Sequence, residues 1–109
     1  MADLQWNKEF ALEQTAGDEE LLDELLVLFK DSSASDLAQL QQAVEAQDAE
    51  GVVRAAHSLK GASASLGIEG IRQVAMAMEA DARTASIRVA KERLGEMEAL
   101  LTQMQALES

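Results

Sequence analysis

The chain of 109 residues contains no cysteine, no proline and no tyrosine, and only three aromatic residues. Without cysteine it can form no disulfide framework, no thiolate nucleophile and no cysteine-bound metal site. The absence of proline, together with abundant Ala, Leu, Glu, Gln and Met, favours helices and leaves little from which to build strands. The length is enough for one domain with a single core, which we expect to cover residues 1–109.

Long apolar runs are also missing, since no run is longer than five residues, the length of the one from Leu25 to Phe29. We therefore expect no membrane span and no signal peptide, and predict a soluble cytoplasmic protein. Cations are scarce as well: nine Lys and Arg stand against 20 Asp and Glu, which gives a net charge of −11. Phosphate backbones attract clustered Lys and Arg, and these nine are scattered along the chain, so we expect no nucleic-acid partner.

The chain has only one histidine, His57. A single histidine cannot start a zinc site, and position 54 is an arginine, so the Glu-x-x-His pair of a di-iron bundle is missing. No glycine-rich phosphate loop of the ATP or dinucleotide type is present. Ser58 adjoins the histidine, but neighbours on a helix diverge by roughly 100°, too far for a nucleophile and its base. We therefore predict no metal site and no bound cofactor.

Capping residues and apolar spacing predict a short N-terminal helix followed by a long one. Asn7 can cap a helix that runs to about Thr15, and Trp6 and Phe10 flank that cap closely enough to clip the segment onto the rest of the fold. Gly17 ends this helix. Asp18 can cap the next, which we expect from about residue 19 to 47 because its apolar phase continues through the serine-rich stretch 31–35.

Three further helices complete the predicted fold. Asp48 can cap the helix that carries the histidine, which ends near Leu66 with Gly67 free to adopt a left-handed conformation. A fourth apolar stripe starts at Ile71, and a turn at residues 84–86 separates it from the last helix. Short connections favour an all-α, antiparallel up-down four-helix bundle over about residues 18–108, with the short helix added. Four methionines are predicted to fill the core: Met76, Met78, Met97 and Met104.

The histidine helix has an unusual surface. Its core-facing stripe consists of Val52, Ala56, Leu59, Ser63 and Leu66, and His57 points roughly 120° away from the middle of that stripe. Gly61 follows one turn later and costs the helix about 1 kcal/mol relative to alanine, so its bare backbone needs a reason, such as close approach of another surface. No Asp or Glu lies between Gly51 and Ile68, where about three would be expected by chance. We therefore expect an exposed imidazole with a cation, Lys60, and no carboxylate nearby, an environment suited to phosphorylation.

These residues resemble the signature of the histidine-containing phosphotransfer (Hpt) domains of two-component phosphorelays: His57-x-Leu59-Lys60-Gly61, then small residues, then Leu66-Gly67. The likeness extends from about Asn7 to the end of the chain and includes Leu28-Phe29, Asp48 and Met78-Glu79. The departures are mild. Ile71 and Met78 stand where leucine is commoner in the family, and the turn before the last helix lacks a glycine.

The resemblance implies that His57 accepts a phosphoryl group from a receiver-domain phosphoaspartate and passes it to another receiver aspartate. Lys60 would stabilise the phosphoryl oxygens, and Gly61, Ala64 and Ser58 would form the docking face. The implied partners are response-regulator receivers and a hybrid sensor histidine kinase. Mg²⁺ would belong to the receiver, and the chain, which we expect to be a monomer, would carry a phosphohistidine without being an enzyme.

Other interpretations remain open at this stage. His57 could be a surface histidine without a role, and Lys60 an ordinary solvated lysine. The chain could also be a helical adaptor that binds a receiver or kinase without accepting phosphate, although such an adaptor has no need of this histidine and lysine. A structural coiled coil would show one unbroken heptad, whereas the apolar phase here breaks at Gly17, Asp48 and Gly67.

Overall fold

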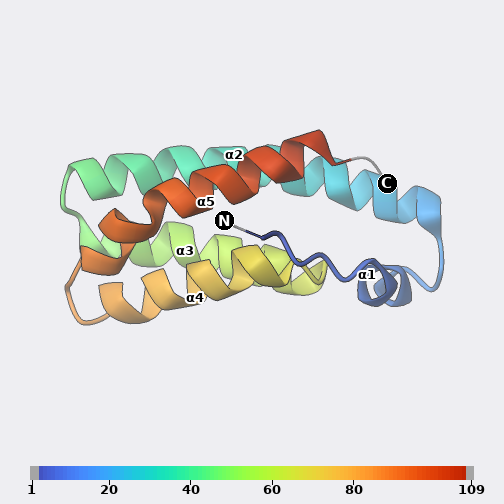
Figure 1. Ribbon diagram of the computed structural model, residues 1–109, viewed down its shortest axis with the longest axis horizontal. Helices are drawn as coiled ribbons and strands as arrows, with labels where there is room; N and C mark the ends of the chain where they lie inside the picture. Colours follow the sequence, from blue (N-terminus) through green and yellow to red (C-terminus); the bar gives the residue numbers. More distant parts are fainter. Residues whose placement is uncertain (1–2, 108–109) are drawn as a thin grey trace.

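The computed structural model describes residues 3–107; the predicted domain limits at residues 1 and 109, and the predicted end of the bundle at 108, lie outside this range. Five helices follow one another along the chain: α1 (Lys8–Gln14), α2 (Glu19–Glu45), α3 (Ala49–Ser65), α4 (Glu69–Ala82) and α5 (Arg88–Ala106). In Figure 1, α2 to α5 run lengthwise and α1 lies at one end of them. Each long helix packs against the next, and α5 packs back against α2. The predicted all-α, up-down four-helix bundle with a short N-terminal helix is confirmed.

Three side chains that were predicted to cap helices do so in the structure. The side chains of Asn7, Asp18 and Asp48 accept hydrogen bonds from backbone N–H groups near the starts of α1, α2 and α3. These bonds satisfy donors that have no partner within the helix, and so fix where each helix begins. Gly67, after α3, has a φ of +69°, the left-handed conformation predicted for it.

The serine-rich stretch does not interrupt α2, which runs unbroken from Glu19 to Glu45. Ser33 is buried, and its hydroxyl donates to the carbonyl of Lys30 at 3.2 Å. A hydroxyl that bonds back to its own helix needs no other partner, so a serine can occupy a position on the core side. The apolar periodicity therefore outweighed the loop-like composition of residues 31–35.

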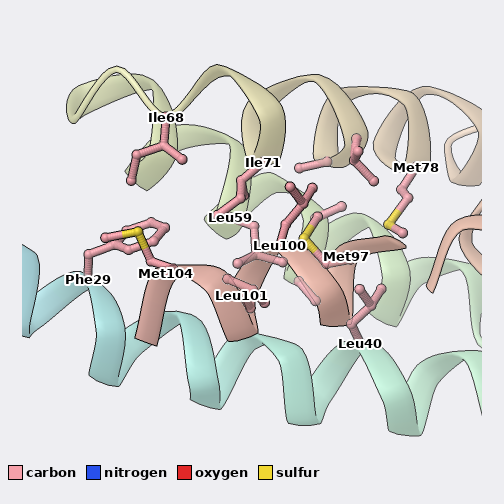
Figure 2. Packing of buried hydrophobic residues seen from close by; sticks show 14 of the residues in the cluster. Phe29, Leu40, Leu59, Ile68, Ile71, Met78, Met97, Leu100, Leu101 and Met104 are labelled. Carbon is pink, nitrogen blue, oxygen red and sulfur yellow. The ribbon is translucent and has the colours of Figure 1, made fainter. Parts of the chain in front are cut away.

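The core lies between the four long helices, and Figure 2 shows large side chains from all of them meeting there. The largest fully buried ones include Leu22, Leu40, Leu59, Ile71, Met78, Met97, Leu100 and Met104. Three of the four methionines predicted for the core are buried. The prediction for Met76 was wrong, since its exposed fraction is 44%. It lies two residues before Met78, which turns it roughly 200° around α4 and onto the outer surface.

The N-terminal segment is bound to the turn between α3 and α4 by main-chain pairing. Trp6 and Ile68 form an antiparallel bridge, and the Trp6 indole Nε1 donates to the carbonyl of Leu66 at 2.9 Å. The backbone N–H of Gly70 donates to the carbonyl of Leu4 at 2.9 Å, and a Cβ on Gly70 would collide with this segment. Ile68 provides no side-chain cap for α4, so the carbonyls of the segment take over that role.

Candidate functional site

The candidate site lies on the outer face of α3. Val52, Ala56, Leu59 and Ser63 are fully buried, as predicted for the core-facing stripe. The side chain of His57 is 64% exposed, and Ser58, Gly61 and Ala64 are also exposed. The helix thus presents its histidine to solvent on a surface of small residues.

A carboxylate lies directly against the histidine, so the prediction of a carboxylate-free environment was wrong. Glu79 of α4 places Oε2 2.9 Å from Nδ1 of His57, and its Oε1 lies 2.5 Å from Nζ of Lys60. Arg83, one turn further along α4, contacts the same carboxylate through Nη2 at 2.5 Å. The stretch without acids is a property of the sequence around α3, whereas packing brings the acid from the neighbouring helix.

The Glu79 carboxylate is held ionised. Its side chain is only 4% exposed, and it is the one buried ionisable residue within residues 3–107. Burial alone would raise the pKa of this carboxyl, but hydrogen bonds from Lys60, Arg83 and His57 outweigh burial and lower the pKa from 4.5 to about 2. An ionised carboxylate can only accept hydrogen bonds, so Nδ1 of His57 must carry the proton. The free lone pair of the neutral ring is then on Nε2.

This depressed pKa predicts how the stability of the fold depends on pH. The folded-state pKa of Glu79 lies below its unfolded value, so the ionised carboxylate stabilises the fold above about pH 4.5, and this contribution disappears as the pH falls toward 2. We expect Glu79→Gln to lower the free energy of unfolding at pH 7 by about 1–3 kcal/mol. Denaturant unfolding at pH 7 and pH 3 should show the two proteins converging at low pH. A constant difference at both pH values would contradict this linkage.

Cations gather around the site, although they are scattered along the sequence. Arg54 lies one turn before His57 on α3, where it also faces Asp48 at 3.9 Å, and Arg83 lies one turn after Glu79 on α4. Lys60 and Arg83 both pair with the one Glu79 carboxylate, so the cluster carries a surplus positive charge while His57 is neutral. Such a surplus complements an anionic group bound at the imidazole.

Gly61 has no packing role within residues 3–107. A Cβ built on it would meet no atom of another element within 4 Å, unlike one on Gly67 or Gly70. The Ser65 hydroxyl donates to the Gly61 carbonyl at 3.1 Å, so it stays within the helix. The surface one turn beyond His57 therefore carries no protruding side chain at position 61, as the sequence predicted.

A shallow apolar groove continues this surface toward α2. It is lined by Gln14, Leu25, Leu28, Phe29, Ser32, Ala62, Ser65 and Leu66. Leu28, one of the lining residues, is 63% exposed and gives the groove an open apolar edge. Ser58 donates to Asp36 of α2 at 2.7 Å, so α2 also contacts the residue that follows His57.

Comparison with known proteins identifies the fold and the family. The family model described as "Hpt domain" matches residues 24–107, more than half of the chain. The chain belongs to the Hpt domain family. Histidine-containing phosphotransfer protein B (HptB) of Pseudomonas aeruginosa PAO1 has a similar structure, with a TM-score of 0.85 and 24% identity over 94% of this chain and 89% of that one. The Hpt domain of a sensor hybrid histidine kinase from Shewanella gives a TM-score of 0.76 and 21% identity over 95% and 94%. No curated protein matches the sequence.

Membership of the Hpt family gives this domain a histidine phosphotransfer role in phosphorelay signalling. Hpt proteins are phosphoryl shuttles and not kinases, and their partners are receiver domains and hybrid kinases. Within residues 3–107, no helix combines the length and the apolar character that crossing a bilayer requires.

Sequence reasoning missed the contact that Glu79 makes. The residue lies four positions after Ala75 and three before Ala82, which are both buried members of the apolar stripe of α4. An acidic residue at a core-facing position of an amphipathic helix costs free energy to bury unless it has partners. The position of Glu79 on the apolar stripe was therefore the feature of the sequence that could have indicated this contact.

Proposed function

We propose that His57 accepts a phosphoryl group from the phosphoaspartate of a receiver domain and passes it to the aspartate of another receiver, in the cytoplasm, with the whole chain acting as one phosphotransfer domain. The observation that carries this proposal is the exposed imidazole held at Nδ1 by an ionised carboxylate. In the transfer, the lone pair of Nε2 attacks phosphorus and the acyl P–O bond breaks. The electron pair of that bond stays on the receiver carboxylate.

In the proposed step the protein mainly positions the ring and neutralises charge. Phosphoryl transfer passes through a loose transition state whose charge is spread over the equatorial oxygens, so aligned cations matter more than covalent help. Lys60 pairs with the Glu79 carboxylate at 2.5 Å and lies one turn from His57 on α3. We infer that its flexible side chain can carry the ammonium to a phosphoryl group on Nε2. When Lys60 moves to the phosphate, Arg83 remains paired with Glu79 and continues to balance the negative charge of its carboxylate.

The surface around His57 supports docking of a receiver. Gly61, Ala64 and Ser58 leave the imidazole unobstructed, and the apolar groove beside Ser65 offers contact area toward α2. A receiver must bring a recessed aspartate to within bonding distance of Nε2, and a side chain standing one turn from the histidine would prevent this. The mixture of an apolar groove and a bare helix face suits an interface that forms and dissociates quickly. We propose that the domain acts as a monomer.

The test is a transfer assay with a panel of radiolabelled, phosphorylated receiver domains from the same genome. We expect the label to move from at least one receiver to this chain, and to be acid-labile and base-stable as a phosphoramidate is. A receiver that binds this domain without transferring its label would instead favour the adaptor interpretation.

Lys60→Ala is expected to slow phosphoryl uptake by roughly 10- to 100-fold, because a charge-assisted hydrogen bond to the phosphoryl oxygens is lost. Glu79 keeps Arg83 and His57 as partners in this variant, so the domain should remain folded. Single-turnover transfer is measured beside thermal unfolding. Arg72→Ala, which removes a cation paired with Glu69 on α4, serves as the matched control and should transfer normally. Undiminished transfer in Lys60→Ala would show that its charge is incidental.

A further inference from the structure

Glu79 is more than a structural partner of the histidine, and this inference rests on the proposed function of His57. Its Oε2 lies 2.9 Å from Nδ1, the ring nitrogen that does not take part in transfer. The Glu79 side chain is only 4% exposed, so the packing of α3 against α4 holds its carboxylate in place beside Nδ1. The ring therefore faces a fixed negative charge on one side and solvent on the other.

The protonation of the ring decides how easily its phosphoryl group leaves. When the N–P bond breaks, its electron pair returns to Nε2. If Nδ1 carries a proton, the leaving group is neutral imidazole; if it does not, the leaving group is an imidazolate anion, which is a far poorer one. Attack by Nε2 on phosphorus likewise leaves the ring as an imidazolium that must be stabilised.

We propose that Glu79 keeps the proton on Nδ1 of phosphorylated His57, so that the phosphoryl group remains ready for transfer at every pH at which the relay works. In the step toward a receiver, a carboxylate oxygen of the receiver attacks phosphorus and the N–P electron pair returns to Nε2. The ring becomes neutral and Nδ1 keeps its proton throughout. Loss of that proton would leave two hydrogen-bond acceptors, Nδ1 and Oε2, in contact with no proton between them, which is unfavourable.

The charged groups around the ring are compatible with this role. On α3, Arg54 and Lys60 lie one turn to either side of His57; on α4, Arg83 contacts Glu79; on α2, Asp36 is engaged by Ser58. Of these groups, only Glu79 makes a hydrogen bond to a ring nitrogen within residues 3–107, at 2.9 Å from Nδ1.

The test uses chemical phosphorylation, so it does not depend on any receiver. Phosphoramidate, a small-molecule phosphoryl donor, modifies exposed histidines directly, and ³¹P NMR then follows hydrolysis of the phosphohistidine between pH 6 and pH 9. We expect the hydrolysis rate of the wild-type protein to stay nearly constant over this range. In Glu79→Gln, whose amide can either accept from or donate to Nδ1, the rate should fall by up to about tenfold per pH unit above neutrality.

Glu69→Gln is the matched control, because it removes another ion-paired carboxylate from α4 that does not touch His57; it should retain the wild-type profile. A ¹⁵N spectrum of the unmodified ring adds a readout that stability alone does not change: Nδ1 should be protonated in the wild-type protein and share the proton with Nε2 in Glu79→Gln. A wild-type hydrolysis rate that falls with pH as in the variant would overturn the inference. Failure of every receiver to phosphorylate the chain, with these profiles intact, would instead count against the proposed function alone.

Discussion

Replacing His57 with glutamine is expected to abolish phosphoryl uptake from receivers. The chain has no second histidine, so no other imidazole can form a phosphoramidate. Glutamine approximates the size of the ring, and the position is 64% exposed, so the fold should change little. Single-turnover transfer should fall to the background set by receiver hydrolysis, a loss of at least about 1000-fold.

Two controls make this result specific. Ser58→Ala changes the adjacent exposed residue, removes its hydrogen bond to Asp36, and should leave transfer within a few-fold of wild type. Circular dichroism of each variant verifies the fold. Labelling that persists in His57→Gln would mean that the acceptor is another residue.

Bulky substitutions at Gly61 are expected to prevent receiver docking without unfolding the domain. A Cβ at this position meets no neighbouring element, and alanine stabilises a helix by up to about 1 kcal/mol relative to glycine. Gly61→Ala should therefore melt at the same temperature or higher. Gly61→Gln and Gly61→Arg should remain folded but bind a cognate receiver at least about tenfold more weakly, because their side chains occupy the approach to the imidazole.

Gly95 provides a matched control for Gly61. It is also a helical glycine with open space at its Cβ, but it belongs to α5, which packs against α2 and α4 and not beside His57. Gly95→Gln should change helix stability by a similar amount and leave receiver binding intact. If the Gly61 variants bind and transfer normally, the docking face lies elsewhere on the bundle.

The fold could be predicted because its signals are local. Asn7, Asp18 and Asp48 cap helices through bonds to residues three positions later, and the apolar phase of α2 carries the helix through its serines. The pairing of Trp6 with Ile68 could not be predicted in the same way. It depends on backbone groups, which every residue has, and the glycine at position 70 that leaves room for the segment does not reveal its partner.

Only the part of the candidate site that belongs to α3 could be predicted from the sequence. The exposure of His57 and the open space beside Gly61 follow from helical spacing within one element. The ion pairs of Glu79 depend on how α4 lies against α3, a tertiary relation that no count of acids along the chain can express. That count led to the wrong expectation that the imidazole has no carboxylate beside it.

The most direct test of the proposed role of His57 locates the phosphoryl group after transfer from a receiver. A ¹⁵N-labelled chain is phosphorylated by its cognate receiver, purified at alkaline pH and studied by ³¹P and ¹⁵N NMR. We predict one phosphoryl group per chain, bonded to Nε2 of His57, with the proton on Nδ1. A phosphoryl group on Nδ1, on a carboxylate or on a serine, or none from any receiver that binds, would contradict this role.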